Sequence, residues 1–296
     1  MSQVPNGTLT SVAGIEVGHW TDPVAQTGCT VIRLPEPNVI AGETRGAAPG
    51  SRETALLQPG MSVEAAQAIV LSGGSAFGLA AADGVMRELE AAGRGYPTPA
   101  GPVPIVPAAV LYDLLVGDSA VRPTATDGVS AFRAASGDPV QQGRVGAGTG
   151  ATVSKWRGTP QPAGIGSAAV EIAGVTVGAL VALNALGDIF SLEGIALTGG
   201  PHAAAPLSVG PPVGENTTLA VVATDAALTR VELTRLAVRA QDAFAACIRP
   251  AHTRFDGDTC FAVSCGDGAA LVDNVAEGAF EAMGRAIEAA VHHSRD

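Results

Sequence analysis

Hydrophobic and polar residues change their spacing repeatedly along this chain, and each change predicts a strand or a helix. The clearest case begins at Thr217, where a β-branched and apolar run predicts a buried strand. Thr229 and Glu232 then form a capping box, which predicts the start of a helix. A strand over 260–264 and a helix over 271–292 are expected to follow. The apolar face of the first helix is expected to comprise Val231, Leu236, Ala240, Phe244 and Cys247.

The preceding part of the chain shows the same alternation in shorter pieces. Strands are expected over 11–19 and 28–34, and two or three strands joined by glycine turns over 167–186 and 189–197. The segment 65–71 is apolar, and helices are expected over 75–92 and 126–136. Glycine and proline predict irregular backbone over 44–60, 93–107 and 201–214. We expect a subunit contact at 44–60, and we expect 201–214 to be a linker that is a natural place for cleavage. Because strands and helices alternate in blocks, the sequence predicts layered α/β packing, taken here as one domain over 1–296.

Composition narrows the class of protein. The 296 residues are 47% hydrophobic and 15% charged, which excludes a disordered chain. A net charge of −11 disfavours a nucleic-acid partner, and the low share of charged residues favours a homo-oligomer. No signal peptide and no membrane-spanning segment are expected, since the apolar stretch 172–186 is too short to cross a bilayer. The four cysteines lack metal-site spacing, so we expect reduced core residues and a cytoplasmic protein.

The strongest candidate for chemistry lies where the buried strand begins. Asn216 precedes Thr217, and we expect the chain to cut itself between these two residues. Thr217 would then carry a free α-amine, whose pKa of about 7.7–8.0 makes it a base for its own hydroxyl near neutral pH. The alternative is that Asn-Thr-Thr is ordinary turn-to-strand sequence.

Two carboxylates are expected to assist Thr217. Asp256 and Asp258 stand two positions apart at the predicted start of a strand, which would place both on one face. Neighbouring carboxylates separate each other's pKa values, so that one stays ionised while the other carries a proton. The alternative is an Asp-Gly turn without a catalytic role.

Three further residues are candidates for the same site. Lys155 is the only lysine of the chain, and we weigh an oxyanion donor against a surface lysine beside Trp156. Asn184 lies inside an apolar run and is either an oxyanion donor or an amide that bridges strands. Tyr112 is one of two tyrosines, and a half-buried structural role is the favoured interpretation for it. No cofactor or metal motif is found: the glycine-rich stretches fit neither a dinucleotide fingerprint nor a P-loop, and the histidines are dispersed.

These motifs, taken together, resemble the L-aminopeptidase/D-esterase family, and within it the nylon-oligomer hydrolases most closely. The matching segments are IEVGH at 15–19, LSGGSAFGL at 71–79, VPIVP at 103–107, GAGTGAT at 146–152, GENTTL at 214–219 and DGDT at 256–259. They extend through nearly the whole chain in the order of the family.

The resemblance implies a self-processing amide hydrolase with a four-layer αββα sandwich. It implies cleavage into an α part (1–216) and a β part (217–296) that stay associated as a tetramer of heterodimers. Thr217 would be the nucleophile, Asp256 and Asp258 would assist it, and Lys155, Tyr112 and Asn184 would support it. Aminopeptidase members of the family begin the β part with Ser and use Ser and Glu downstream, whereas this chain has Thr and two Asp.

The substrates implied are linear amides, either 6-aminohexanoate oligomers or small peptides. Two alternatives remain at this point. One is an acyltransferase of the ornithine-acetyltransferase type, which passes the acyl group to an amine. The other is an uncleaved, non-catalytic relative that acts as a binding module.

Overall fold

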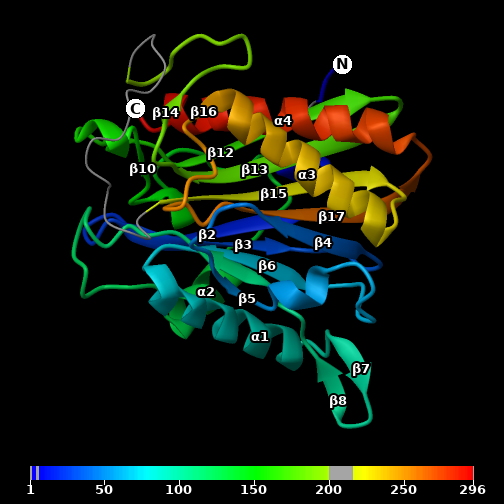
Figure 1. Cartoon of the computed structure of the whole chain (residues 1–296). Helices are drawn as coiled ribbons and strands as arrows, with labels where there is room; N and C mark the ends of the chain where they lie inside the picture. The colour runs from blue at the N-terminus through cyan, green and yellow to red at the C-terminus, as the bar shows by residue number, and fades with distance from the viewer. Residues whose placement is uncertain (1, 5–6, 200–215, 296) are drawn as a thin grey trace.

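Two β-sheets lie face to face between two pairs of helices (Figure 1). The computed structural model describes residues 2–4, 7–199 and 216–295. The six-stranded sheet has the order β1 (Ser2–Gln3), β12 (Ile165–Ile172), β13 (Val175–Asn184), β15 (Thr217–Ala226), β17 (Thr259–Gly268) and β4 (Val39–Thr44). The five-stranded sheet has the order β2 (Glu16–Asp22), β3 (Thr27–Arg33), β6 (Ala68–Ser72), β9 (Ala108–Val110) and β5 (Gly50–Arg52).

The helices cover the two outer faces of this pair of sheets (Figure 1). Helices α3 (Arg230–Cys247) and α4 (Val272–His292) cover the six-stranded sheet, and α1 (Ala81–Ala91) and α2 (Ala125–Arg133) cover the other. Three two-stranded ribbons complete the set: β7 (Tyr96–Thr98) with β8 (Gly101–Val103), β10 (Thr152–Val153) with β11 (Gln161–Pro162), and β14 (Asp188–Ile189) with β16 (Ile248–Arg249). This arrangement confirms the four-layer αββα sandwich.

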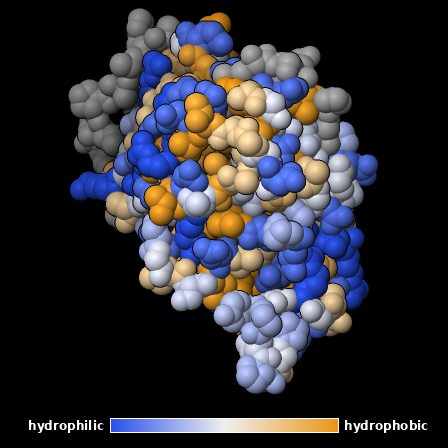
Figure 2. All heavy atoms as spheres, turned by 90° about the vertical axis from the view of Figure 1, so that its right-hand side faces the viewer, coloured by the Kyte–Doolittle hydropathy of each residue, from blue (hydrophilic) through white to orange (hydrophobic). Residues whose placement is uncertain are grey.

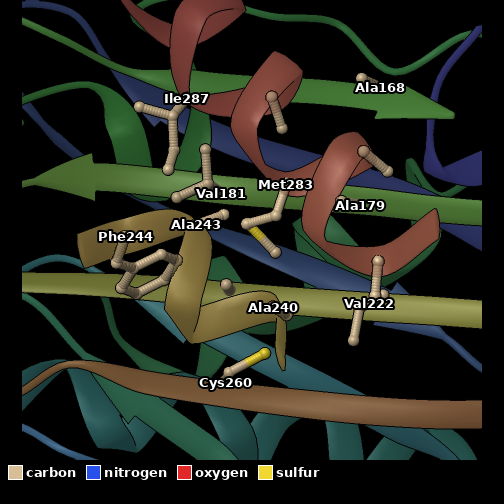
Figure 3. Close-up of a cluster of buried hydrophobic side chains, with 14 of the residues drawn as sticks. Ala168, Ala179, Val181, Val222, Ala240, Ala243, Phe244, Cys260, Met283 and Ile287 are labelled. Atoms are coloured by element: carbon tan, nitrogen blue, oxygen red, sulfur yellow. The ribbon is translucent and has the colours of Figure 1, made fainter. Parts of the chain in front are cut away.

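Three hydrophobic cores separate the four layers. Alternate residues of β15 point to opposite faces of the sheet, so Val222 packs toward α3 and α4 while Val221 packs toward the five-stranded sheet. Figure 3 shows the first core, where Phe244 and Met283 from the helices meet Val181 and Val222 from the sheet. Because both faces of β15 are covered, the continuous apolar run predicted a buried strand correctly.

Helix α3 begins at the predicted capping box. The Thr229 side chain accepts a hydrogen bond from the Glu232 backbone N–H, and Glu232 Oε2 accepts one from the Thr229 N–H at 2.8 Å. Four members of the predicted apolar face are buried: Leu236, Ala240, Phe244 and Cys247. Val231 is 63% exposed, so its assignment to this face was wrong. Five residues turn a helix by about 140° beyond a full turn, which places Val231 away from Leu236.

Several shorter elements differ from expectation. The strand predicted over 11–19 begins at Glu16, after a 3₁₀ turn over Leu9–Ser11. The helix predicted from residue 75 begins as a 3₁₀ helix, Ser75–Ala80, and continues as α1. The strand predicted over 189–197 ends at Ile189.

Two segments expected to be irregular contain strands. The segment 93–107 contains the β7–β8 ribbon, and 44–60 contains β5. The linker predicted over 201–214 lies outside the described residues. All four cysteines are free thiols. None of the described helices combines the length and the apolar character needed to cross a membrane.

Candidate active site

Thr217 is the first residue of β15, at the end of a strand held on both sides. It pairs with Asn184 of β13, and from Leu219 onward β15 also pairs with β17 in parallel. Its side chain is buried, and Oγ1 donates to the Asn216 carbonyl oxygen at 2.5 Å. The Thr217 hydroxyl therefore lies beside the carbonyl of the peptide bond predicted to be cut.

Asn184 is the centre of a buried hydrogen-bond group beside Thr217. Its Oδ1 accepts from Lys155 Nζ at 2.7 Å and from the Thr152 backbone N–H at 3.0 Å. Its Nδ2 donates to the Tyr112 carbonyl oxygen at 3.0 Å. Lys155 Nζ also donates to the Asn184 backbone oxygen at 3.0 Å. The structure thus joins Lys155, Asn184 and Tyr112, and Asn184 links this group to Thr217.

The contacts show how each of these residues is held. Asn184 is fully buried and bridges separate segments of the chain. Tyr112 contacts the group through its backbone carbonyl. Lys155 is half-buried and points its ammonium at Asn184, unlike a freely solvated surface lysine.

Asp256 and Asp258 lie on the other side of Thr217, in the segment that precedes β17. Asp258 Oδ1 accepts from the Thr218 backbone N–H at 2.7 Å, and its Oδ2 lies 2.8 Å from His252 Nδ1. Asp256 Oδ2 accepts from Thr253 Oγ1 at 2.6 Å and from the Thr253 N–H at 2.8 Å. Because β17 begins only at Thr259, the expectation that both carboxylates share one face of a strand was wrong.

Burial changes the proton affinity of this acidic segment. Burial, together with the negative charge of Asp258, raises the pKa of Asp256 from 3.8 to about 6. For His252, burial lowers the pKa, but the hydrogen bond and the charge of Asp258 outweigh burial, so that the pKa of His252 is raised overall. The site therefore holds a carboxyl that titrates close to neutral pH.

A loop from the N-terminal part of the chain holds the two aspartates in place. The Ala48 N–H donates to the Asp256 carbonyl at 2.9 Å, and the Arg45 N–H donates to the Asp258 carbonyl at 3.0 Å. Gly46 is required there, since an added Cβ would lie 2.3 Å from the Asp256 carbonyl oxygen. The segment 44–60, predicted as a subunit contact, thus supports the site within one chain.

Sequence reasoning missed three members of this neighbourhood. His252 is one of several dispersed histidines in the sequence, and its position four residues before Asp256 is the available signal. Asp113 is buried next to Tyr112 and accepts from Thr27 Oγ1 and from the Gly74 N–H, each at 2.7 Å. Burial raises the pKa of Asp113, and an acidic residue inside an apolar stretch was the available signal. The Gly257 backbone N–H donates to the Asn216 carbonyl oxygen at 3.0 Å, and a backbone contact of this kind leaves no signal in the sequence.

No cluster of three His, Cys, Asp or Glu side chains suited to a metal ion occurs within 7–199 and 216–295. The side-chain groups at the site are instead the Thr217 hydroxyl, the Lys155 ammonium, the Asn184 amide, the Asp256 and Asp258 carboxyls and the His252 imidazole. Such a set can activate a hydroxyl and transfer protons during acyl transfer.

Comparison with known proteins agrees with this chemistry. Residues 7–295 match Peptidase family S58. The uncharacterized aminopeptidase ML1167 of Mycobacterium leprae (strain TN) is 42% identical over 297 residues, covering 88% of this chain and 79% of that protein. The 6-aminohexanoate-oligomer endohydrolase of Agromyces sp. (strain KY5R) is 31% identical over 272 residues, covering 85% of this chain and 73% of that protein.

Solved structures share the fold. A Burkholderia sp. β-aminopeptidase superposes with a TM-score of 0.74 at 22% identity, covering 99% of this chain and 87% of that one. The L-aminopeptidase D-Ala-esterase/amidase of Ochrobactrum anthropi, described as a variant of the N-terminal-nucleophile hydrolase fold, gives 0.75 at 22% identity, covering 97% and 86%. This chain belongs to Peptidase family S58, is an amide-bond hydrolase, and has the fold of the N-terminal-nucleophile hydrolases.

Proposed function

We propose that the protein cuts its own chain between Asn216 and Thr217 and then hydrolyses linear amides with Thr217 as the nucleophile. The observation that carries this proposal is the 2.5 Å contact between Thr217 Oγ1 and the Asn216 carbonyl oxygen at the buried start of β15. A hydroxyl held against the carbonyl of its own peptide bond is placed for an N-to-O acyl shift. Cleavage would leave the Thr217 α-amine as the base for later turnovers.

The surrounding residues support specific roles in turnover. Lys155 and Asn184 form the ammonium and amide group beside Thr217 and would stabilise the oxyanion. Asp258 accepts a hydrogen bond from the Thr218 N–H and so would fix the strand next to the nucleophile. Asp256, with a pKa of about 6, would give a proton to the leaving amine and take one from water. Tyr112 would position Asn184 through its carbonyl.

The substrate class is that of linear amides, namely small peptides or 6-aminohexanoate oligomers, as the names of the relatives suggest. Water accepts the acyl group in this proposal. The acyltransferase alternative is not favoured by the peptidase and hydrolase relatives.

Intact mass of the purified protein tests the proposal. Wild type is expected to give pieces of residues 1–216 and 217–296, whereas Thr217→Ala gives one uncut chain without amidase activity. Thr218→Val is the matched control, because the neighbouring Thr218 hydroxyl is buried without a hydrogen-bond partner and its loss should leave cleavage intact. Cleavage of Thr217→Ala at the same bond would refute the role of Thr217. An uncut wild type would favour the non-catalytic alternative.

We also propose that several copies associate, as a tetramer of cut chains, and that the enzyme works in the cytoplasm. Figure 2 shows apolar atoms gathered in the middle of the face on which α3 and α4 begin. Val231 is 63% and Leu271 is 75% exposed at the starts of these helices, which supports an interface there. The four free thiols support a reducing compartment, which cell fractionation would check.

A further inference from the structure

The Asn216 carbonyl oxygen accepts two hydrogen bonds. One comes from Thr217 Oγ1 at 2.5 Å, and the other comes from the Gly257 backbone N–H at 3.0 Å. In the proposed self-cleavage, this oxygen gains the negative charge when the hydroxyl attacks. A donor that reduces the barrier must lie about 2.7–3.1 Å from such an oxygen, and the Gly257 N–H does.

We propose that the Gly257 backbone N–H is the oxyanion donor for cleavage of the bond between Asn216 and Thr217. This inference rests on the self-cleavage proposed above and adds the group that makes the step fast.

The chemical step balances with water as the only co-reactant. A bond forms between Thr217 Oγ1 and the Asn216 carbonyl carbon, and the carbonyl oxygen becomes an oxyanion that the Gly257 N–H holds. The bond to the Thr217 nitrogen then breaks, the hydroxyl proton passes to that nitrogen, and an ester with a free amine results. Water adds to the ester carbonyl, the ester C–O bond breaks, and Oγ1 recovers a proton. Asn216 is left as a carboxylate.

The donor is held in position before the reaction begins. The loop of residues 45–48 fixes the segment that carries the donor. Ala48 N–H donates to the Asp256 carbonyl, which belongs to the same peptide group as the Gly257 N–H, and Arg45 N–H donates to the Asp258 carbonyl beyond Gly257. A parallel β-bridge joins Asn216 to Asp256 and brings the N–H to the carbonyl. A dipole fixed in advance costs no reorganisation when charge develops.

The packing explains why residue 257 is glycine. A Cβ at this position would lie 2.8 Å from Thr217 Oγ1 and 2.7 Å from the Ala48 carbonyl oxygen. Any side chain would therefore push the N–H away from Asn216 or displace the hydroxyl. Asn216 and Asp256 are 1% and 2% exposed, so water is largely excluded, and a single N–H acts strongly on an oxyanion.

An amide-to-ester exchange tests the N–H without adding a side chain. Glycolic acid replaces Gly257 in the full chain, made by nonsense suppression in cell-free translation, and cleavage is followed by mass. The matched control carries glycolic acid at Gly60, in an exposed turn where an added Cβ would meet no atom within 4 Å. We expect the ester at 257 to slow self-cleavage about 10²–10³-fold relative to the control.

The outcomes separate this inference from the proposed function. Cleavage of the 257 ester within about threefold of the control would overturn the oxyanion role and leave self-cleavage standing. An unmodified chain that never cleaves would overturn both.

If the ester prevents folding, hydrogen exchange of the uncut Thr217→Ala chain decides instead. The Gly257 amide is then expected to exchange at least about 100-fold more slowly than the exposed Gly60 amide, since opening a hydrogen bond limits exchange. Equal exchange rates would overturn the proposal.

Discussion

Replacing Asp256 by asparagine is expected to change how the stability of the folded chain depends on pH. Burial and the charge of Asp258 raise the pKa of Asp256 to about 6, whereas a carboxyl in the unfolded chain titrates near 3.8. Between these values the folded state keeps a proton that the unfolded state has released. A raised carboxyl pKa therefore lowers stability as pH increases through this window.

The size of the effect follows from the shift. About two pKa units correspond to about 3 kcal/mol of unfolding free energy, complete by about pH 7 and absent at about pH 3.5. Asparagine does not titrate, so the Asp256→Asn chain does not lose this unfolding free energy as pH rises. The difference in stability between the two chains is expected to grow by about 3 kcal/mol in favour of asparagine over that range.

Urea unfolding followed by circular dichroism at several pH values measures this difference. Both chains carry Thr217→Ala, which keeps them uncut in the proposed scheme and makes unfolding comparable. Asp267→Asn, at an exposed position, is the control that measures how loss of any carboxylate changes stability with pH. A difference that stays constant with pH, or that favours aspartate as pH rises, would refute the claim that Asp256 is desolvated beside a second carboxylate.

Two further results are expected. Lys155→Met removes both ammonium hydrogen bonds to Asn184 and should slow self-cleavage and amide hydrolysis about 10–100-fold. Lys155→Arg should not restore the rates, because a planar guanidinium replaces a compact ammonium. Self-cleavage of Lys155→Met at the wild-type rate, followed by intact mass, would contradict this. Light scattering should give a mass near four chains, which falls when Val231→Arg and Leu271→Arg are combined, whereas a wild-type mass of one chain would contradict the proposed interface.

The long elements of the fold could be predicted because their sequence pattern and their burial agree. β15, α3 and α4 each carry a continuous or periodic apolar signal that packing only reinforces. The sequence does not predict the β7–β8 ribbon, because prolines disfavour strands. Pro97 and Pro102 pair there in an isolated two-stranded ribbon, whose outer edges do not need every N–H.

The site could be predicted only as far as side chains reveal it. Thr217 and the two aspartates stand out by residue type, and Lys155 stands out as the only lysine. The sequence does not show that the Tyr112 carbonyl and the Gly257 N–H are used, because every residue has such groups and only the fold selects one. His252 was missed since its role depends on Asp258, which approaches it through a turn.

The order of strands in the six-stranded sheet has a consequence for whether a cleaved chain could refold after unfolding. β15 and β17 lie between β13 and β4, so a cut before Thr217 would leave the C-terminal piece inserted into a sheet built by the N-terminal piece. Neither piece could then rebuild that sheet alone, and refolding would become a bimolecular encounter. Self-cleavage would thus make folding a one-way event, and the lifetime of the mature enzyme would be set by its unfolding rate instead of its folding equilibrium.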